Sequence, residues 1–483
     1  MAGPAAPQPV VPDTMIVMKF GGTSLAGAGP IRKVQQIVRR FAARRPVVVV
    51  SALAGVTDDL LDMARAAAGG RPHDVRRRLA RLAARHAEVV EGLGLPRPLD
   101  AALSRALAAE FDELGGVLQG MLLLREPGRR SLDLAASFGE RLSARIVAAR
   151  LAAAGLRARY ADARDFIATD DTHGAAHVDV AATRRRTRAR LAPLLRGGGL
   201  PVVTGFIGRG PDGATTTLGR SGSDYTAAIL AEALGARELW IWKEVDGVCT
   251  ADPGLVAGAR VVPRLSYEEA TEMSHFGAEV IHPRTMQPAR RAGIAIRIKN
   301  TFRPAAPGTV IAARPQGRRG PLMVSSLDGM ALVTIEGAGL FGQPGMVLRL
   351  LSPVAAAGTN IYMISMSSSE YNISFAINED EVARTMRALE RDFRARGWMG
   401  EQVARVTVER GMAAVAVVGA GMKGQRGIAG RIFSALGAKG VNVVAIAQGS
   451  SEYNITIMVR GRDMRAAVRA IHQRLAATRR ARR

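Results

Sequence analysis

The C-terminal part of this chain repeats itself, and the repeat constrains the fold more than any other feature of the sequence. Glycine and asparagine positions recur at a constant offset of 82 residues. The pairs are Gly337 and Gly419, Gly339 and Gly421, Gly345 and Gly427, Gly358 and Gly440, Asn360 and Asn442, and Ser-Glu-Tyr-Asn-Ile at 369–373 and 451–455. A constant offset over so many positions indicates duplication of a structural unit rather than a bias in composition.

Each copy has the pattern of a small αβ module. A strand (331–335 or 413–418) leads into a glycine-rich loop and a helix, and a later strand covers 372–377 or 454–458. This order predicts a ferredoxin-like βαββαβ fold in each copy. We place the two modules at 330–400 and 410–476.

The preceding part of the chain predicts one large α/β domain. Short apolar runs at 15–18, 46–50, 201–204 and 238–242 alternate with stretches of helical periodicity. This alternation is typical of a mainly parallel sheet between helices. We place this domain at 15–312, between a loose tail (1–14) and a linker rich in proline and glycine (313–329), and we place a basic tail at 477–483.

Charge and composition exclude several classes of protein. The net charge is +25, but aromatic residues make up only 4% of the chain, so bases would have few rings to stack on. We therefore expect a solvated arginine-rich surface and no nucleic-acid partner. The single Cys249 excludes an internal disulfide, and no apolar run is long enough to span a membrane. Because no Lys or Arg precedes Lys19, a signal peptide is not indicated, and we expect a cytoplasmic protein.

Two motifs carry little weight. Gly-x-Gly-x-x-Gly begins at Gly208, Gly337 and Gly419, but a chain with 53 glycines produces such matches by chance. No acidic residue follows the last two at the spacing that a ribose requires. His173 and His177 stand beside acidic residues, yet a solvated loop explains them better than a metal site because no second ligand cluster is evident.

The string Lys-Phe-Gly-Gly-Thr-Ser at 19–24 is a candidate anion site. Two glycines after a strand let the backbone approach an anion, and Lys19 adds a compact positive charge. The alternative is an ordinary strand-to-helix turn with a solvated lysine.

Two further strings allow a functional and a structural interpretation. Residues 216–226 bring small residues and Arg220 to a helix N-terminus, which favours anions, although Ser223 or Asp224 can equally serve as a helix cap. In Ser-Phe-Gly-Glu at 137–140, Glu140 can hold an ammonium group or simply stabilise the first turn of a helix.

Taken together, these strings resemble the aspartate kinases of the amino-acid kinase superfamily, and the repeats resemble paired ACT domains. The resemblance runs from Met15 to about Arg474. It is carried by the strings at 19–24, 51–57, 137–140, 217–224, 245–253 and 276–283, and by those at 360–365 and 442–448 in the repeats.

The resemblance implies ATP-dependent phosphorylation of the side-chain carboxylate of L-aspartate, the first step of lysine, threonine and methionine biosynthesis. An aspartate carboxylate is already ionised at pH 7, so charge neutralisation and positioning are needed rather than a base. The implied catalytic residues are Lys19, Arg220 and Asp224. Ser51, Thr57, Glu140 and Arg220 would bind aspartate, with Glu140 on its ammonium and Arg220 on its α-carboxylate.

Nucleotide contacts follow from the same resemblance. ATP would contact Lys19, Gly21, Gly22, Thr23, Ser24, Ser223, Asp224, Lys243, Glu244 and Asp252. Mg²⁺ would be bound mainly through ATP and water, with no dominant protein ligand. Many relatives have Thr-Asp where this chain has Lys243-Glu244.

The ACT pair implies feedback control by an amino acid, lysine or threonine. The expected effector contacts are Gln343, Met346, Asn360, Ile361, Asn442 and Gln448. Exposed sheet edges predict a homodimer or higher oligomer through these modules. We expect no homoserine dehydrogenase domain after the second repeat. The alternative function is a catalytically inactive amino-acid sensor, but Lys19, Glu140 and Arg220 are all present.

Overall fold

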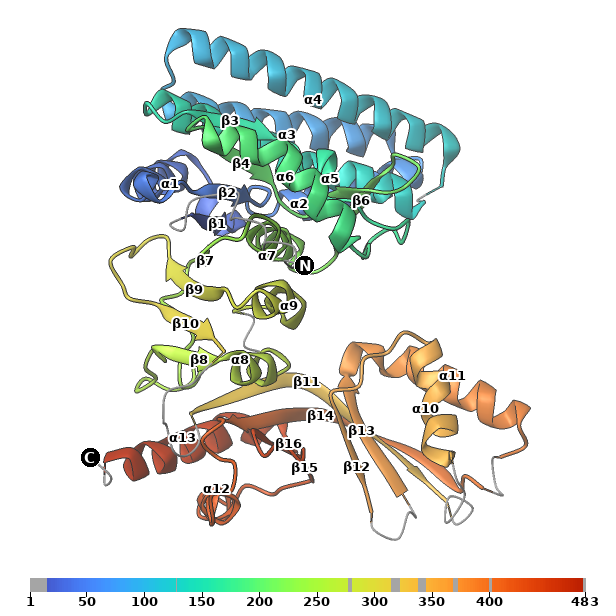
Figure 1. The fold of residues 1–483 in the computed structure, drawn as a ribbon. Helices are drawn as coiled ribbons and strands as arrows, with labels where there is room; N and C mark the ends of the chain where they lie inside the picture. The colour runs from blue at the N-terminus through green and yellow to red at the C-terminus, as the bar shows by residue number, and fades with distance from the viewer. Residues whose placement is uncertain are drawn as a thin grey trace, which may run out of the picture. The chain divides into compact units, whose positions relative to one another are not determined.

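The computed structural model describes residues 15–126, 128–276, 280–313, 322–337, 345–367, 372–398 and 402–480, with backbone only for 476–480. The predicted tail at 1–14, residues 314–321 of the predicted linker, the effector candidate Gln343 and the basic residues 481–483 lie outside the described residues. The chain forms two compact units (Figure 1). The first contains residues up to Val248 with Pro263–Tyr267 and Val280–Ala313, and the second contains the remainder.

An eight-stranded sheet forms the centre of the first unit. In spatial order its strands are β3 (Ala158–Ala161), β4 (Leu200–Thr204), β2 (Val47–Val50), β1 (Ile16–Phe20), β7 (Glu238–Lys243), β9 (Ala295–Asn300), β10 (Thr309–Ala312) and β8 (Arg264–Ser266). All neighbours pair parallel except β9 and β10, which confirms the predicted mainly parallel sheet. A small hairpin of β5 (Ile207–Arg209) and β6 (Thr215–Thr217) follows β4.

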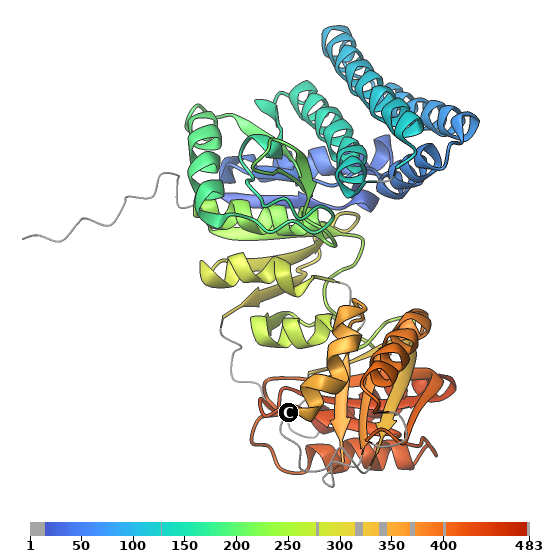
Figure 2. The same cartoon turned by 90° about the vertical axis from the view of Figure 1, so that its right-hand side faces the viewer.

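Helices cover both faces of this sheet. They are α1 (Ala28–Arg40), α2 (Val56–Ala68), α3 (Pro72–Leu93), α4 (Arg97–Leu124), α5 (Arg129–Ala153), α6 (Val180–Arg196), α7 (Gly222–Leu234) and α9 (Pro283–Arg291). Both views show the long helices α3 and α4 side by side (Figures 1 and 2). Among the described residues, none of the helices combines the length and the hydropathy needed to cross a bilayer.

Strand β1 shows how the sheet separates core from site. Its alternate residues Ile16, Met18 and Phe20 are buried in one hydrophobic cluster with residues of α1 to α5. Side chains alternate along a strand, so Lys19 points to the opposite face, where α7 packs on β1. A lysine in an otherwise apolar strand is thereby placed against the start of α7.

The second unit contains both repeats on one six-stranded antiparallel sheet. The order is β12 (Met363–Met366), β13 (Asn372–Asn378), β11 (Met323–Glu336), β14 (Arg405–Val418), β16 (Asn454–Arg460) and β15 (Ala445–Gln448). The helices are α10 (Met346–Ala356) and α11 (Val382–Ala395) in the first repeat and α12 (Ile428–Gly437) and α13 (Met464–Arg480) in the second. The first repeat has the βαββαβ order, and the second has the order βαββα and takes its fourth strand from β11, so the predicted ferredoxin-like fold class is confirmed.

The long strands β11 and β14 belong to both modules (Figure 1). Met330–Glu336 of β11 pairs with β13, whereas Met323–Leu327 pairs with the end of β14 and completes the second module. Residues 323–329, which the sequence analysis assigned to a linker, are therefore strand. The reason is that the second module takes its fourth strand from the segment that precedes the first repeat.

The second unit also includes residues that come before the repeats. Ala251, Leu255 and Val256 share a hydrophobic cluster with the second repeat. In α8 (Tyr267–Ser274), the buried Glu269 accepts a hydrogen bond from the Ala420 backbone amide at 2.8 Å. The predicted boundary at 312 therefore does not coincide with the division into compact units, and the domain boundaries stay predictions.

Candidate active site

The candidate site lies where the central strands of the first unit end. Parallel strands β4, β2, β1 and β7 are neighbours, so their carboxyl ends meet at one edge of the sheet. Lys19 is next to last in β1, and Lys243 is the last residue of β7. Ser51 follows β2 directly. Ligands of open α/β sheets bind at this edge, so its polar groups are the first candidates.

Lys19 is buried and makes an ion pair. It is only 6% exposed, and its Nζ lies 2.5 Å from the Asp224 carboxylate in the first turn of α7. The Lys243 Nζ lies 3.6 Å from the other oxygen of the same carboxylate. Asp224 therefore holds two ammonium groups at the end of adjacent strands.

The charge on Asp224 follows from these contacts. Burial alone would raise the pKa of its carboxyl, but Lys19 and Lys243 outweigh burial and hold that pKa below its usual range. The carboxylate stays ionised at neutral pH. It can therefore hold both ammonium groups in place before any ligand arrives.

The structure contradicts the interpretation of Ser223 or Asp224 as the N-cap of a helix. The N-cap of α7 is Ser221, so both residues lie inside the first turn. Gly205 explains why this turn sits so close to the strand ends, since a Cβ there would come within 2.6 Å of the Ser223 Cβ. The Asp224 carboxylate pairs with the two lysines and is not the helix cap.

Glu140 is a buried carboxylate with one oxygen that lacks a hydrogen-bond partner among the described residues. It is 3% exposed, and among the described residues its Oε2 finds no hydrogen-bond partner. Ser223 Oγ approaches the other oxygen at 3.5 Å. Glu140 lies in the middle of α5, so the alternative of a first-turn residue is wrong. That helix starts at Arg129, well before the string that carried the prediction.

Burial dominates the protonation of Glu140. It raises the pKa of the carboxyl to about 8, although the Ala52 amide, the Lys19 charge and the Ser223 hydroxyl all act in the opposite direction. A buried carboxyl without a full set of donors is poised to receive a cation, because ion pairing would offset its desolvation. An ammonium group is the simplest such ligand.

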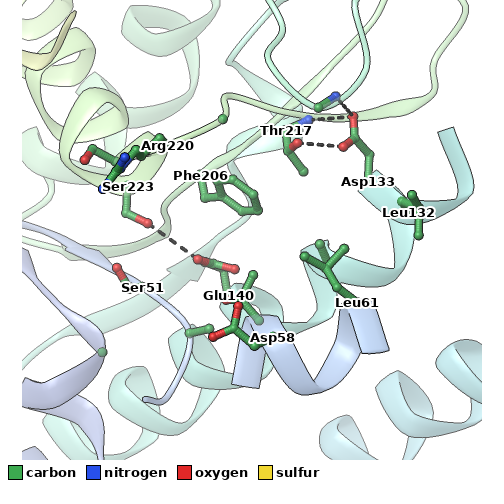
Figure 3. Close-up of a pocket in the computed structure, with 18 of the residues that line it drawn as sticks. Ser51, Asp58, Leu61, Leu132, Asp133, Glu140, Phe206, Thr217, Arg220 and Ser223 are labelled. Carbon is green, nitrogen blue, oxygen red and sulfur yellow. Dashed lines mark hydrogen bonds between the residues drawn. The ribbon is translucent and has the colours of Figure 1, made fainter. Parts of the chain in front are cut away.

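One cavity of about 760 Å³ is lined by both Lys19 and Glu140 (Figure 3). Several predicted residues line it: Lys19, Gly22, Ser51, Thr57, Glu140, Arg220 and Ser223. Figure 3 shows Glu140 and Ser223 facing each other across it. Cationic and anionic side chains thus share one cavity, as recognition of a zwitterionic ligand requires.

Arg220 stands on a constrained loop at the cavity. Gly219 has a φ of +75° and Ser221 a φ of +56°, so Arg220 is flanked by two left-handed residues. A non-glycine residue in that region is uncommon and costs free energy, which is typical of functional loops. The Arg220 side chain is exposed at the cavity, where a carboxylate can reach it.

Some groups of the predicted phosphate-binding loop at 19–24 are already hydrogen-bonded within the fold. A Cβ on Gly22 would stand 3.1 Å from the Ala52 carbonyl oxygen, so glycine is needed for this close approach. The Gly21 amide donates to the Trp242 carbonyl. Ser24 is buried, and its hydroxyl bonds Thr301 at 2.7 Å, whereas Thr23 is exposed. The Ser24 hydroxyl therefore stabilises the fold through its bond to Thr301.

The remaining nucleotide candidates are distributed over both units. Glu244 follows β7 in the first unit and is exposed, and its carbonyl accepts a hydrogen bond from Asn300 at 3.0 Å. Asp252 is exposed and belongs to the second unit. Their contacts with ATP stay predictions.

Sequence reasoning missed the far wall of the cavity. Asp133, Phe206 and Thr217 line it together with His173. His173 Nδ1 lies 3.0 Å from the Asp133 carboxylate, and His177 pairs with Asp170 instead. Within the part of the chain that the structure describes, no three His, Cys, Asp or Glu side chains are grouped to hold a metal ion. A local motif could not reveal Asp133, because its partners lie 40 and 84 residues away in the sequence.

The predicted effector residues are divided between the two repeats, and their role stays a prediction. A second cavity of about 220 Å³ lies in the second repeat, with Gln425, Ile428, Gln448 and Glu452 in its lining. Asn442 and Asn360 are exposed, Ile361 is half-buried, and Met346 is buried in the core of the first repeat. Of the described effector candidates, Gln448 is the one in this lining.

Comparison with known families matches both parts of the chain. The amino acid kinase family matches residues 14–300, and an ACT domain family matches 333–393 and 415–475. Aspartokinase 3, chloroplastic, of Arabidopsis thaliana is 33% identical over 94% of this chain and 80% of its own. Bifunctional aspartokinase/homoserine dehydrogenase 1 of Zea mays is 35% identical over 96% of this chain and 50% of its own. The chain thus spans about half the length of the first curated relatives that it matches.

Solved structures resemble nearly the whole chain. Aspartokinase III of E. coli in complex with aspartate and ADP (R-state) has a TM-score of 0.82 at 28% identity, covering 95% of this chain and 99% of that one. The same enzyme in complex with lysine and aspartate (T-state) has a TM-score of 0.79 at 28% identity, covering 96% and 99%.

Proposed function

The chain belongs to the aspartokinase family of amino acid kinases, and from that premise we propose that it transfers the γ-phosphoryl group of ATP to the side-chain carboxylate of L-aspartate. The products are 4-phospho-L-aspartate and ADP. One observation carries the proposal: the cavity that contains Lys19 also contains a buried carboxylate with an unpartnered oxygen and an arginine on its rim. Such a set recognises an amino acid beside a phosphate.

Each charged side chain of the cavity binds a substrate group of opposite charge. Glu140 holds the substrate ammonium, and Arg220 holds the α-carboxylate as a planar fork. The side-chain carboxylate of the substrate is then directed toward Lys19. Since this carboxylate is already an anion, no base is required, and the barrier lies in bringing it up to the triphosphate.

Lys19 and Lys243 offset that repulsion. Both ammonium groups are held by Asp224, so they need little reorganisation when the phosphates arrive. Charge that is already in place stabilises the transition state more than charge that must be recruited. Mg²⁺ on ATP would supply further neutralisation of the phosphates, and phosphate oxygens and water fit it better here than Asp224, whose oxygens face the two lysines.

A hydroxamate assay tests the proposal directly. Acyl phosphates react with hydroxylamine, so aspartate, glutamate and acetylglutamate can be compared as acceptors, and UMP can be followed by coupled ADP release. We expect hydroxamate formation with L-aspartate that requires ATP and Mg²⁺. Lack of product with aspartate, or a stronger signal from another acceptor, would contradict the proposal.

Regulation by an amino acid is the second part of the proposal. The family match to two ACT domains and the cavity in the second repeat support it, and aspartokinase III of E. coli has been crystallised with lysine. L-Lysine and L-threonine are the effectors to test. An effector can inhibit only by binding one state of the enzyme more tightly than another.

Replacing Gln448 by alanine is expected to weaken this inhibition. Gln448 lines the cavity at the end of β15, and losing one hydrogen bond of about 1 kcal/mol raises the half-inhibiting concentration about fivefold. Inhibition curves with L-lysine and L-threonine, each relative to the uninhibited rate of the same variant, measure the effect. Gln473→Ala is the matched control, since Gln473 is an exposed glutamine of α13 that does not line this cavity. Equal shifts in the two variants would refute a specific role of the second cavity.

Association through the ACT sheet completes the proposal. The outer strands β12 and β15 approach each other within the chain, and they carry exposed apolar side chains at Ile364, Met366 and Ile446. Unpaired edges with apolar residues favour pairing with a second copy. We therefore propose a homodimer or larger homo-oligomer, which light scattering of the full chain can measure. The predicted cytoplasmic location stays a prediction.

A further inference from the structure

The Asp133 side chain accepts four hydrogen bonds in the candidate site. It lies in α5, is 4% exposed and lines the cavity. Its Oδ2 accepts hydrogen bonds from His173 Nδ1, the Gly174 amide and the Thr217 amide, each at 3.0 Å, and its Oδ1 accepts one from the Thr217 hydroxyl at 2.6 Å. Figure 3 shows the two bonds to Thr217. Four donors leave this carboxylate little capacity for a ligand.

These bonds hold two segments of the cavity wall together. One is the loop 172–175, and the other is the end of β6 at Thr217, three residues before Arg220. The two segments also contact each other, since the Ala176 amide donates to the Thr217 carbonyl at 2.9 Å. A Cβ on Gly219 would lie 3.2 Å from the Gly174 carbonyl oxygen, so the loop packs directly against the turn that carries Arg220.

Arg284 fastens the same segments from α9. Its guanidinium donates to the Leu218 carbonyl at 2.9 Å and to the Ala176 carbonyl at 2.7 Å, and it stacks on the Tyr225 ring. The backbone before Arg220 is therefore held from two sides. Asp133 and Arg284 thus form a clamp on this backbone. Of the two residues, only Asp133 lines the substrate cavity.

Helix α5 connects this clamp to the ammonium site. Asp133 and Glu140 are seven residues apart, about two helical turns, so both point toward the cavity from one rigid element. Glu140 anchors one charged group of the substrate, and Asp133 positions the loop of the residue that anchors another. The spacing between the two anchors is thus set within a single helix.

We infer that Asp133 is a positioning residue that makes the enzyme select L-aspartate over the longer L-glutamate. The inference rests on the proposed function. A cavity of about 760 Å³ is far larger than either amino acid, so its walls cannot exclude one extra methylene. Selection by length must come from the distance between the fixed anchors and the phosphate. Loosening the loop of Arg220 lets that distance adapt to the longer substrate.

Kinetics of Asp133→Ala and Asp133→Asn test this inference. We expect KM for aspartate to rise about tenfold or more in the alanine variant and less in the asparagine variant, while KM for ATP changes less than twofold. The preference for aspartate over glutamate in kcat/KM falls at least fivefold, a partial loss of the roughly 10- to 200-fold discrimination that one methylene is worth. The Ki of glutamate as a competitor gives the same comparison without turnover.

Two further variants separate positioning from folding. Asp212→Asn is the matched control, because Asp212 caps the tip of the β5–β6 hairpin and pairs with Arg130 of α5 but does not line the cavity. It should leave the preference unchanged. Thr217→Val removes one donor to Asp133 at nearly constant volume and should lower the preference in the same direction, which keeps the test valid if Asp133→Ala does not fold.

The outcomes are distinguishable. If native enzyme phosphorylates aspartate but Asp133→Ala and Thr217→Val lower kcat/KM equally for both amino acids, the inference is overturned and Asp133 is only structural. If native enzyme makes no aspartyl phosphate, the proposed function itself fails, and this inference fails with it.

Discussion

Replacement of Lys19 by methionine is expected to lower kcat about a thousandfold. Removing one preorganised charge-stabilising group from a transition state typically costs about 3–4 kcal/mol. Lys19 is placed for this role by β1 and by its 2.5 Å contact with Asp224. Methionine keeps the length and the apolar stem of the side chain, so the loss is chiefly one of charge. Steady-state kinetics with saturating aspartate and ATP measure it.

The same replacement is also expected to lower thermal stability. It leaves Asp224, which is 3% exposed, with Lys243 as its remaining lysine at 3.6 Å. Leaving a buried charge poorly paired is destabilising. The double variant Lys19→Met/Asp224→Asn removes that charge and should regain stability without regaining activity. If either variant turned over aspartate at the native rate, Lys19 would have no role in the transfer.

Replacement of Glu140 by glutamine is expected to raise KM for aspartate about a hundredfold. A charge-assisted hydrogen bond between an ammonium and a buried carboxylate contributes up to about 3 kcal/mol, and glutamine retains the shape without the charge. KM for ATP should remain within about twofold. A comparable rise in both KM values would indicate that Glu140 supports the fold of the cavity rather than the ammonium group.

The pH dependence of Glu140 gives an independent check. Burial holds its pKa at about 8, and the substrate ammonium binds the ionised form. In native enzyme kcat/KM for aspartate should therefore rise about tenfold per pH unit below pH 8 and then level off. The Glu140→Gln variant should lack this rise. A flat native profile between pH 6 and 8 would contradict the assignment.

Stability provides the control for this variant. Because the folded-state pKa lies above the unfolded one, the stability contributed by Glu140 is fully present below about pH 4.5 and is lost as pH rises through about 8. Glutamine does not titrate, so at pH 8.5 the variant should be at least as stable as the native protein. Loss of activity in a well-folded variant then reports on binding.

Local strings predicted the parts of the site that stand at the ends of elements. Lys19 follows an apolar run, and Arg220 stands between glycine-rich residues before a helix, so both were visible without a structure. The string at 137–140 left the role of Glu140 open, and only the resemblance to a family favoured the ammonium site, since a position in the middle of α5 has no local signal of function. The repeat predicted the fold of the second unit, because a constant offset between matching positions indicates a duplicated structural unit.

Long-range pairing explains what the sequence could not predict. Asp133 acts through donors 40 and 84 residues away, and Ser24 bonds Thr301 across 277 residues. Met323–Leu327 has the composition of a linker but pairs with residues of β14 that lie 87 to 95 positions later in the sequence. In each case the residue type is ordinary and its partner is set by the fold.

A crystal structure of the full chain with L-aspartate and a non-hydrolysable ATP analogue tests the central claim most directly. The account predicts the aspartate ammonium beside Glu140, its α-carboxylate on Arg220, and its side-chain carboxylate facing the terminal phosphate near Lys19. A triphosphate bound away from the end of β1, or aspartate bound outside this cavity, would contradict it.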